Sequence, residues 1–232
     1  MVGKDPWVVD YEKQEHELQP KRETNMGRFA SNHGGGTEFK QVNAGAHVAR
    51  CVSIIDLGTQ HGEYEGKPNS REQVNIRFEL PFETDVFDGV EKPMIVGLFL
   101  TNSLGEKATM RKYLENWRAR PFTAEELEKF DLNNILGKPC VVSVIHNAKD
   151  KAVVKGISAL PKGTVCPPAV NPLSSFWIEE WDQGKFDSLP QFYQEVIAKS
   201  DEYAAAFGGT PSKGDAFEGS TDDEVAEDDV PF

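Results

Sequence analysis

Apolar and polar residues alternate with a period of two in several short segments of the chain, which is typical of half-buried β-strands. The alternation is clearest where Val74, Ile76, Phe78 and Leu80 are separated by polar residues. Four other segments are rich in β-branched residues and end at glycine, proline or polar loops. The sequence therefore predicts five strands, at residues 46–58, 72–80, 94–101, 140–147 and 152–160.

Helical patterns separate the third strand from the fourth. Ser103 precedes an apolar stripe that ends before Pro121, and Glu106 three residues later completes a capping-box pattern. Residues 123–130 (TAEELEKF) predict a second, short helix with a threonine cap. A further helix is expected over residues 188–207, with Ser188 as its cap. Gly97, inside the third strand, predicts a bend or bulge.

The order of three strands, a helical segment and two strands is that of an OB-fold, a five-stranded and partly open Greek-key barrel. We therefore predict a mainly β protein with helical insertions, with a different small barrel or a sandwich as the alternative. The expected organisation is a polar, glycine-containing arm (1–44), an OB-fold nucleic-acid-binding domain (45–163), a C-terminal extension with a helix (164–207) and a disordered acidic tail (208–232).

Negative charge is concentrated in that tail. The 232 residues include 38 acidic and 25 basic side chains, which gives a net charge of −13. Eight of the acidic residues lie within residues 215–232, where there is no Lys or Arg, so the rest of the chain carries 30 acidic and 25 basic residues, a net charge of −5. Such a body has room for a basic groove, so the overall charge does not exclude a nucleic-acid ligand.

The tail ends in Asp228, Asp229, Val230, Pro231 and Phe232. A terminal ring and carboxylate suit a pocket with a cation beside it, and neighbouring aspartates add electrostatic steering. We expect these five residues to bind a partner protein; the alternative is a tail that only increases solubility. The ending resembles the C-terminal tip of bacterial and phage single-stranded DNA-binding proteins, in which aspartates precede Ile-Pro-Phe; here Val replaces Ile.

The body carries a second resemblance. The stretches AHVARCVSIIDLGTQ, NIRFELP, SLGEKATMRKYLENWRAR and NILGKPCVVSVIHN, within residues 44–205, resemble phage replication proteins that bind single-stranded DNA with an OB-fold. This implies sequence-tolerant, non-enzymatic binding of single-stranded DNA in replication or recombination, and a tail that recruits replication or recombination proteins. The long helical insertion and the extension differ from the short bacterial type, so tetramers are not implied, and the oligomeric state stays open.

Single strands are bound by cations that follow the phosphates and by aromatic rings that stack on bases. An OB-fold uses the face of strands 2 and 3 and the loops between strands 1–2 and 4–5. The candidates there are Arg50, Tyr64, Lys67, Arg71, Asn75, Arg77, Phe99, Lys149, Lys151 and Lys155. Arg77 is central because it shares a strand face with Asn75 and Gln73. Trp117, on a helical apolar stripe, is expected in the core.

Two other functions fit parts of the sequence. Asp56 and Glu79 are carboxylates that a metal-dependent nuclease on a β-barrel would use, although no carboxylate cluster accompanies them. A protein–protein adaptor that binds no nucleic acid is the second alternative.

No metal or cofactor is predicted. The only zinc set that the sequence suggests lacks the close spacing of structural sites; it comprises His47, Cys51, Cys140 and His146. The first residues lack the apolar core of a signal peptide, and no apolar run is long enough to span a bilayer. We expect a cytoplasmic protein, in the host cytoplasm if phage-encoded, without a membrane partner.

Overall fold

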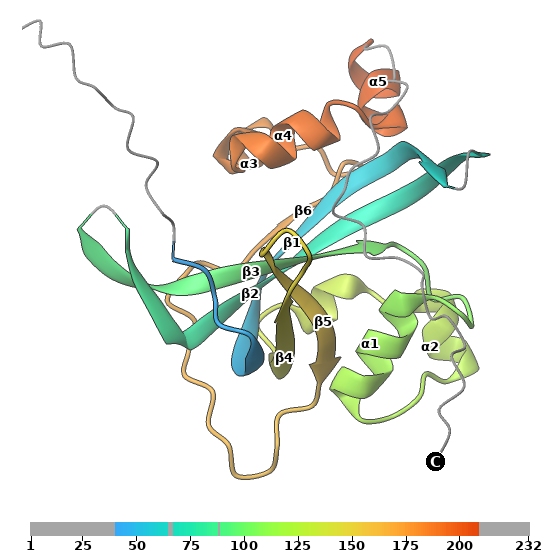
Figure 1. Cartoon of the computed structure of the whole chain (residues 1–232). Helices are drawn as coiled ribbons and strands as arrows, with labels where there is room; N and C mark the ends of the chain where they lie inside the picture. Colours follow the sequence, from blue (N-terminus) through green and yellow to red (C-terminus); the bar gives the residue numbers. More distant parts are fainter. Residues whose placement is uncertain (1–39, 65–66, 88, 209–232) are drawn as a thin grey trace, which may run out of the picture. The chain divides into compact units, whose positions relative to one another are not determined.

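The computed structural model describes residues 40–64, 67–87 and 89–208. Its main element is a six-stranded sheet with the order β3-β2-β1-β4-β5, in which β6 pairs with β1 (Figure 1). The β1–β6 pair is parallel and the other pairs are antiparallel. The strands are β1 (Gly45–Tyr64), β2 (Lys67–Phe87), β3 (Val90–Thr101), β4 (Pro139–His146), β5 (Ala152–Ser158) and β6 (Ser174–Phe176). The prediction of a mainly β protein is confirmed.

Within the described ranges, the path of paired strands ends at β3 and β5, so hydrogen bonds do not close the sheet into a barrel. The first two hairpins are longer than predicted. Residues 59–71 and 81–93 were expected to be mainly loops, but pairing continues from Thr59↔Glu72 to Tyr64↔Lys67 and from Thr84↔Pro93 to Phe87↔Val90. Backbone hydrogen bonds can extend a hairpin without an apolar face, so hydrophobic alternation underestimates its length.

Of the bend or bulge predicted at Gly97, the bulge is wrong. Gly97 pairs in register with Arg77, and the irregularity between β2 and β3 lies between Leu80 and Thr84. The absence of a side chain at Gly97 instead leaves room for Asn75 and Tyr193 on the outer face of the sheet.

Two apolar cores lie on opposite faces of β1. Ile54 belongs to the inner core, with the predicted apolar row of β2 (Val74, Ile76, Phe78, Leu80). Its neighbour Ile55 belongs to the outer core, which includes Phe176, Phe186 and Ile197 from the C-terminal segment. Figure 1 shows α3, α4 and α5 on one side of the long β1–β2 strands and α1 and α2 on the other. The two faces of one strand therefore hold both layers together.

The helices are α1 (Thr109–Arg118), α2 (Ala124–Lys129), the 3₁₀ helix η2 (Leu132–Ile135), α3 (Gln183–Ser188), α4 (Gln191–Ile197) and α5 (Asp201–Phe207). The capping box of Thr123 and Glu126 is confirmed. Trp117 is in the core as predicted, 7% exposed, and its ring lies 5.7 Å from that of Phe78. No helix in the described ranges has the length and apolar character needed to cross a membrane.

Two predicted caps are wrong. The helix expected after Ser103 begins after Ala108, and the Ser103 hydroxyl instead accepts a hydrogen bond from the Gly105 amide. The single helix expected from Ser188 is two helices, because Ser200 caps a new one by accepting from the Tyr203 amide. Serine favours helix starts, but its hydroxyl also forms local turns, and the sequence pattern does not separate the two.

A buried carboxylate attaches the C-terminal segment to the sheet. Glu79 of β2 is only 1% exposed. One of its oxygens accepts a hydrogen bond from the Val170 amide at 2.9 Å, and the other accepts from the Asn171 amide at 2.8 Å and side chain at 2.7 Å. A carboxylate buried this deeply requires such donors, because they replace the water that it has lost.

Replacing Glu79 with Gln should therefore lower the free energy of unfolding by about 2 kcal/mol, since the new amide group brings a donor to a site that supplies only donors. Urea denaturation followed by circular dichroism measures this. The matched change at the exposed Glu106 should alter stability by less than about 0.5 kcal/mol. Equal effects of the two changes would contradict the attachment role of Glu79.

Candidate nucleic-acid interface

The polar row of β2 does not lie open to solvent as expected. Asn75 and Glu79 are almost fully buried, Gln73 is 7% exposed, and Arg77 is half-buried. The outer core of the C-terminal segment packs on this side of the sheet. A strand with one apolar and one polar face was predicted, and the polar face is covered because a distant segment supplies the second layer.

An aromatic cluster lies at the edge of this covered face. It consists of Phe99 from β3 and of Phe192 and Tyr193 from α4, and we call it the aromatic cluster. The Phe99 ring is 6.2 Å from each of the other two rings, stacked on Tyr193 and edge-on to Phe192. The Arg77 guanidinium lies 5.7 Å from the centre of the Tyr193 ring. Two predicted residues, Arg77 and Phe99, are therefore brought together.

Phe192 is the functional candidate that the sequence analysis missed. It is 46% exposed, although it is a large aromatic residue in a helix whose buried residues are Val196 and Ile197. The sequence places adjacent aromatic residues at 192 and 193, and neighbouring side chains leave a helix in directions about 100° apart. That adjacency was the available signal for an exposed ring.

Tyr193 is held in place by Asn75. Its hydroxyl donates to Asn75 Oδ1 at 3.0 Å, and burial raises the pKa of the hydroxyl above its ordinary value, so it stays a donor at neutral pH. A Cβ at Gly97 would lie 3.2 Å from the Asn75 amide and 3.4 Å from the Tyr193 hydroxyl oxygen, so glycine makes room for this pair. With 0% exposure, Asn75 positions Tyr193, and the expected direct contact with a nucleic acid does not agree with its burial.

The Arg50 guanidinium donates hydrogen bonds to backbone carbonyls of the fold. Its Nε donates to the Pro167 carbonyl at 2.9 Å, its Nη2 to the Cys166 carbonyl at 2.9 Å and its Nη1 to the Gly137 carbonyl at 2.6 Å. A phosphate would have to compete with these three bonds. The structure thus gives Arg50 an attachment role and does not bring it to the aromatic cluster.

The other predicted cations lie on two hairpins. Lys67 is exposed and Arg71 half-buried on β2, next to the tip of the β1–β2 hairpin. Lys149 and Lys151 are exposed in the β4–β5 turn, where both backbone amides donate to the Asn147 side chain, and Lys155 is exposed on β5. The Tyr64 side chain and the five predicted tail residues, Asp228, Asp229, Val230, Pro231 and Phe232, lie outside the described part of the chain.

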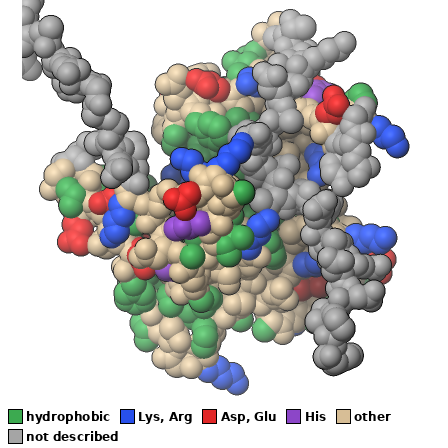
Figure 2. Space-filling view, in the orientation of Figure 1, with side chains coloured by type: hydrophobic (Ala, Val, Ile, Leu, Met, Phe, Trp, Pro, Cys, Tyr) green, Lys and Arg blue, Asp and Glu red, His purple; other side chains and the backbone are tan. Residues whose placement is uncertain are grey.

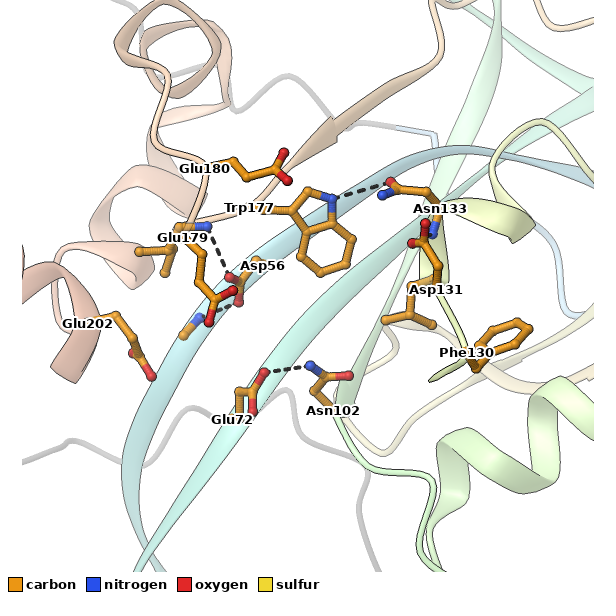
Figure 3. Close-up of a pocket in the computed structure, with 13 residues that line it drawn as sticks. Asp56, Glu72, Asn102, Phe130, Asp131, Asn133, Trp177, Glu179, Glu180 and Glu202 are labelled. Carbon is orange, nitrogen blue, oxygen red and sulfur yellow. Dashed lines mark hydrogen bonds between the residues drawn. The ribbon is translucent and has the colours of Figure 1, made fainter. Parts of the chain in front are cut away.

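On the face shown in Figure 2, basic side chains are not gathered in one patch. In Figure 2 the visible Lys and Arg side chains lie at several separate places among acidic and hydrophobic ones. A cavity of about 490 Å³ is instead strongly acidic (Figure 3). Its lining contains no Lys or Arg and six carboxylate residues: Asp56, Glu72, Asp131, Glu179, Glu180 and Glu202. We call it the acidic pocket, and it repels a polyanion.

The carboxylates proposed for a nuclease have structural partners. Asp56 accepts hydrogen bonds from the Gly58 and Ile178 amides at 2.9 and 3.1 Å, and burial raises its pKa despite these bonds (Figure 3). Both carboxylate oxygens of Glu79 accept hydrogen bonds from residues 170 and 171. Among the residues that the structure describes, no three His, Cys, Asp or Glu side chains are grouped so that they could hold a metal ion.

The cysteines are partly or fully buried thiols. Burial raises the pKa of Cys51 to about 12 and also raises that of Cys140 and Cys166. The histidines of the suggested zinc set have other partners: His47 lies 3.3 Å from the Glu83 carboxylate, and His146 lies 2.9 Å from the Val42 carbonyl.

No protein-family model matches the chain, and no curated protein matches it significantly.

The Tyr193–Asn75 hydrogen bond generates a stability prediction. Replacing Tyr193 with Phe should lower the free energy of unfolding by about 1 kcal/mol, because the ring remains while buried Asn75 loses its partner. Tyr203 also packs on the outer core, and its hydroxyl makes no hydrogen bond within residues 40–208 as described, so Tyr203→Phe is the control. A loss of stability no larger for Tyr193→Phe than for the control would refute the positioning role of Asn75.

Proposed function

We propose that this protein binds single-stranded DNA without sequence preference and that its sheet is an OB-fold. The observed order β3-β2-β1-β4-β5 supports the fold, since it is the order that a five-stranded Greek-key barrel has when opened between β3 and β5. Those two strands also contact each other, although they do not share a hydrogen-bonded ladder. Helices α1 and α2 follow β3 and precede β4, where an OB-fold carries its helix.

The aromatic cluster beside Arg77 carries the functional proposal. Bases stack on exposed rings with little dependence on sequence, and a guanidinium at the same place pairs with a phosphate. Phe192 supplies an exposed ring, Phe99 supports it, and Arg77 supplies the charge. This combination lies on the outer side of strands β2 and β3, which is the face that OB-folds use.

The hairpin cations extend this surface in the proposal. Lys67 and Arg71 on one hairpin, and Lys149, Lys151 and Lys155 on the other, follow the phosphates on either side of the stacked bases. Six carboxylates line the acidic pocket and repel phosphates, so DNA is not expected to pass between η2 and the C-terminal segment. The single-stranded DNA is thereby directed to the aromatic cluster.

The tail has a separate role in the proposal. Its eight carboxylates and the apolar residues Val230, Pro231 and Phe232 bind replication or recombination proteins, with charge steering the encounter and the apolar side chains occupying a pocket of the partner. The same carboxylates compete with DNA for the cations of the body, because both are polyanions. This role follows from sequence pattern alone.

We expect the full chain to bind a labelled poly-pyrimidine oligonucleotide of about 20 nucleotides, with an affinity that falls as salt rises. Phe192→Ala should weaken binding roughly tenfold, because one base loses its stacking partner. Fluorescence anisotropy measures both affinities. Phe207→Ala is the matched control, since Phe207 is 49% exposed against 46% for Phe192 but lies on α5 against Trp181 and Tyr203.

Equal losses of DNA affinity for the two variants would show that the aromatic cluster is not part of the DNA-binding interface. No binding by the full chain even at low salt would support the adaptor alternative and overturn the proposal. Cleavage of the oligonucleotide in Mg²⁺ or Mn²⁺ would support the nuclease alternative.

Deleting residues 215–232 should leave DNA affinity unchanged or raise it, because a competing polyanion is removed. A synthetic peptide of residues 215–232, added back at low salt, should lower the affinity of the shortened chain more than a neutral peptide of equal length does. Weaker DNA binding after the deletion would contradict the competition. Binding of purified replication or recombination proteins to the full and the shortened chain tests recruitment separately.

A further inference from the structure

A second pocket, of about 570 Å³, lies among α1, α2, η2 and the start of β4. Four basic residues and one acidic residue line it, together with apolar side chains that include Trp117, Phe130 and Ile135. The charged lining residues are Arg118, Arg120, Lys129, Lys138 and Glu126. We call it the basic pocket. Its size is in the range of small-ligand sites, and its charge is opposite to that of the acidic pocket.

The single carboxylate of the basic pocket is already used. Arg120 donates to both oxygens of Glu126, at 2.6 and 3.0 Å, and Arg118 donates to one of them. These bonds and the capping bond from the Thr123 amide lower the pKa of Glu126 to about 2. Glu126 therefore stays ionised and fixes the two arginines, and it offsets only one of the four positive charges.

Among the described residues, the two lysines of the pocket have no such partner. Lys129 and Lys138 are both exposed, and no ion pair joins either of them to a carboxylate within the part of the chain that the structure describes. Exposed ammonium groups beside a cavity attract an anion, and their flexible stems let them follow it.

Arg118 is fixed against aromatic rings at the side of the pocket. Its guanidinium lies 4.2 Å from the Phe122 ring centre and 5.4 Å from that of Phe130. Its Nη1 is inaccessible to solvent and has no hydrogen-bond partner among the described residues. The half-buried Phe130 ring thus lines a cavity in which positive charge exceeds negative charge.

Phe130 also lines the acidic pocket, so one residue borders two cavities of opposite charge. An anionic ligand that contacts this ring is repelled from one side and attracted to the other. The combination of an aromatic side chain, mobile cations and a fixed guanidinium selects a ligand with a planar ring and a negative charge close to it.

We propose that the basic pocket binds one nucleotide of the bound single strand, with its phosphate at Lys129, Lys138 and Arg120 and its base against Phe130. This inference rests on the proposed function and adds a second contact on the helical insertion. A nucleotide has the planar ring and adjacent charge that the lining selects, and its volume fits the cavity. The helical insertion thereby takes part in binding as well as in packing.

Photo-crosslinking locates the contact directly. A poly-pyrimidine oligonucleotide in which 5-iododeoxyuridine replaces thymidine forms adducts with aromatic side chains that touch the base. The full chain should give adducts at Phe130 and at the aromatic cluster, identified by mass spectrometry of the digested protein. Adducts at the cluster without any at Phe130 would overturn this inference and leave the proposed function standing.

Charge reversal provides a second measurement. The double variant Lys129→Glu/Lys138→Glu should lose the Phe130 adduct and bind the oligonucleotide roughly tenfold more weakly at low salt. The slope of log affinity against log salt should be about 0.7 smaller, because one phosphate contact on a single strand is lost. Thermal unfolding checks that the variant is folded.

The control is Lys162→Glu/Lys199→Glu, which makes the same change in net charge at two exposed lysines outside the basic pocket. It should keep the Phe130 adduct and the salt slope. Equal effects of the two double variants on affinity, slope and adduct would show that only net charge matters and would overturn the nucleotide site. If the unaltered chain binds no oligonucleotide at all, the proposed function itself fails, which is a distinguishable result.

Discussion

The structure depends on a pair of opposed charges beneath its C-terminal segment. Arg50 of β1 and Glu79 of β2 are register partners, so their side chains leave the sheet on the same face. Arg50 donates to the carbonyls of residues 166 and 167, and Glu79 accepts from the amides of residues 170 and 171. One short stretch of backbone is thus held by a cation at one end and an anion at the other. Neither charge can be buried without this stretch, and the stretch directs the chain into β6 and the outer core.

The elements around the inner core were predictable because the sequence patterns that determine them lie within single strands or helices. The alternation of Val74, Ile76 and Phe78 identifies a strand and its buried face, and Thr123 with Glu126 identifies a helix start within four residues. These local patterns together predicted the order of strands and helices along the chain. The outer half was not predictable, because the partners of the polar row of β2 lie about a hundred residues away: Tyr193 is 118 positions from Asn75.

The candidate site divides in the same way. Sequence pattern indicated Arg77 on the second strand and Phe99 on the third as separate binding candidates, and the structure places both at the aromatic cluster. The pattern could not distinguish a polar side chain that faces solvent from one that positions another residue, which is the difference between Arg77 and Asn75. It also missed Phe192, since exposure of an aromatic residue depends on what its helix packs against. Polar residues on a strand therefore indicate which face of the sheet they lie on. Whether they contact solvent or position another residue depends on the layer that covers that face.

The sharing of β1 between two cores has a consequence for the minimal folding unit. A chain cut after β5 would keep all five strands of the predicted barrel, yet it would expose Ile55 and Leu57, which are fully buried in the outer core. It would also leave Glu79 without its three donors and the β1 edge without β6. An apolar strip beside an unpaired strand edge promotes self-association. Residues 164–207, expected to be an extension, thus belong to the same cooperative unit as the sheet.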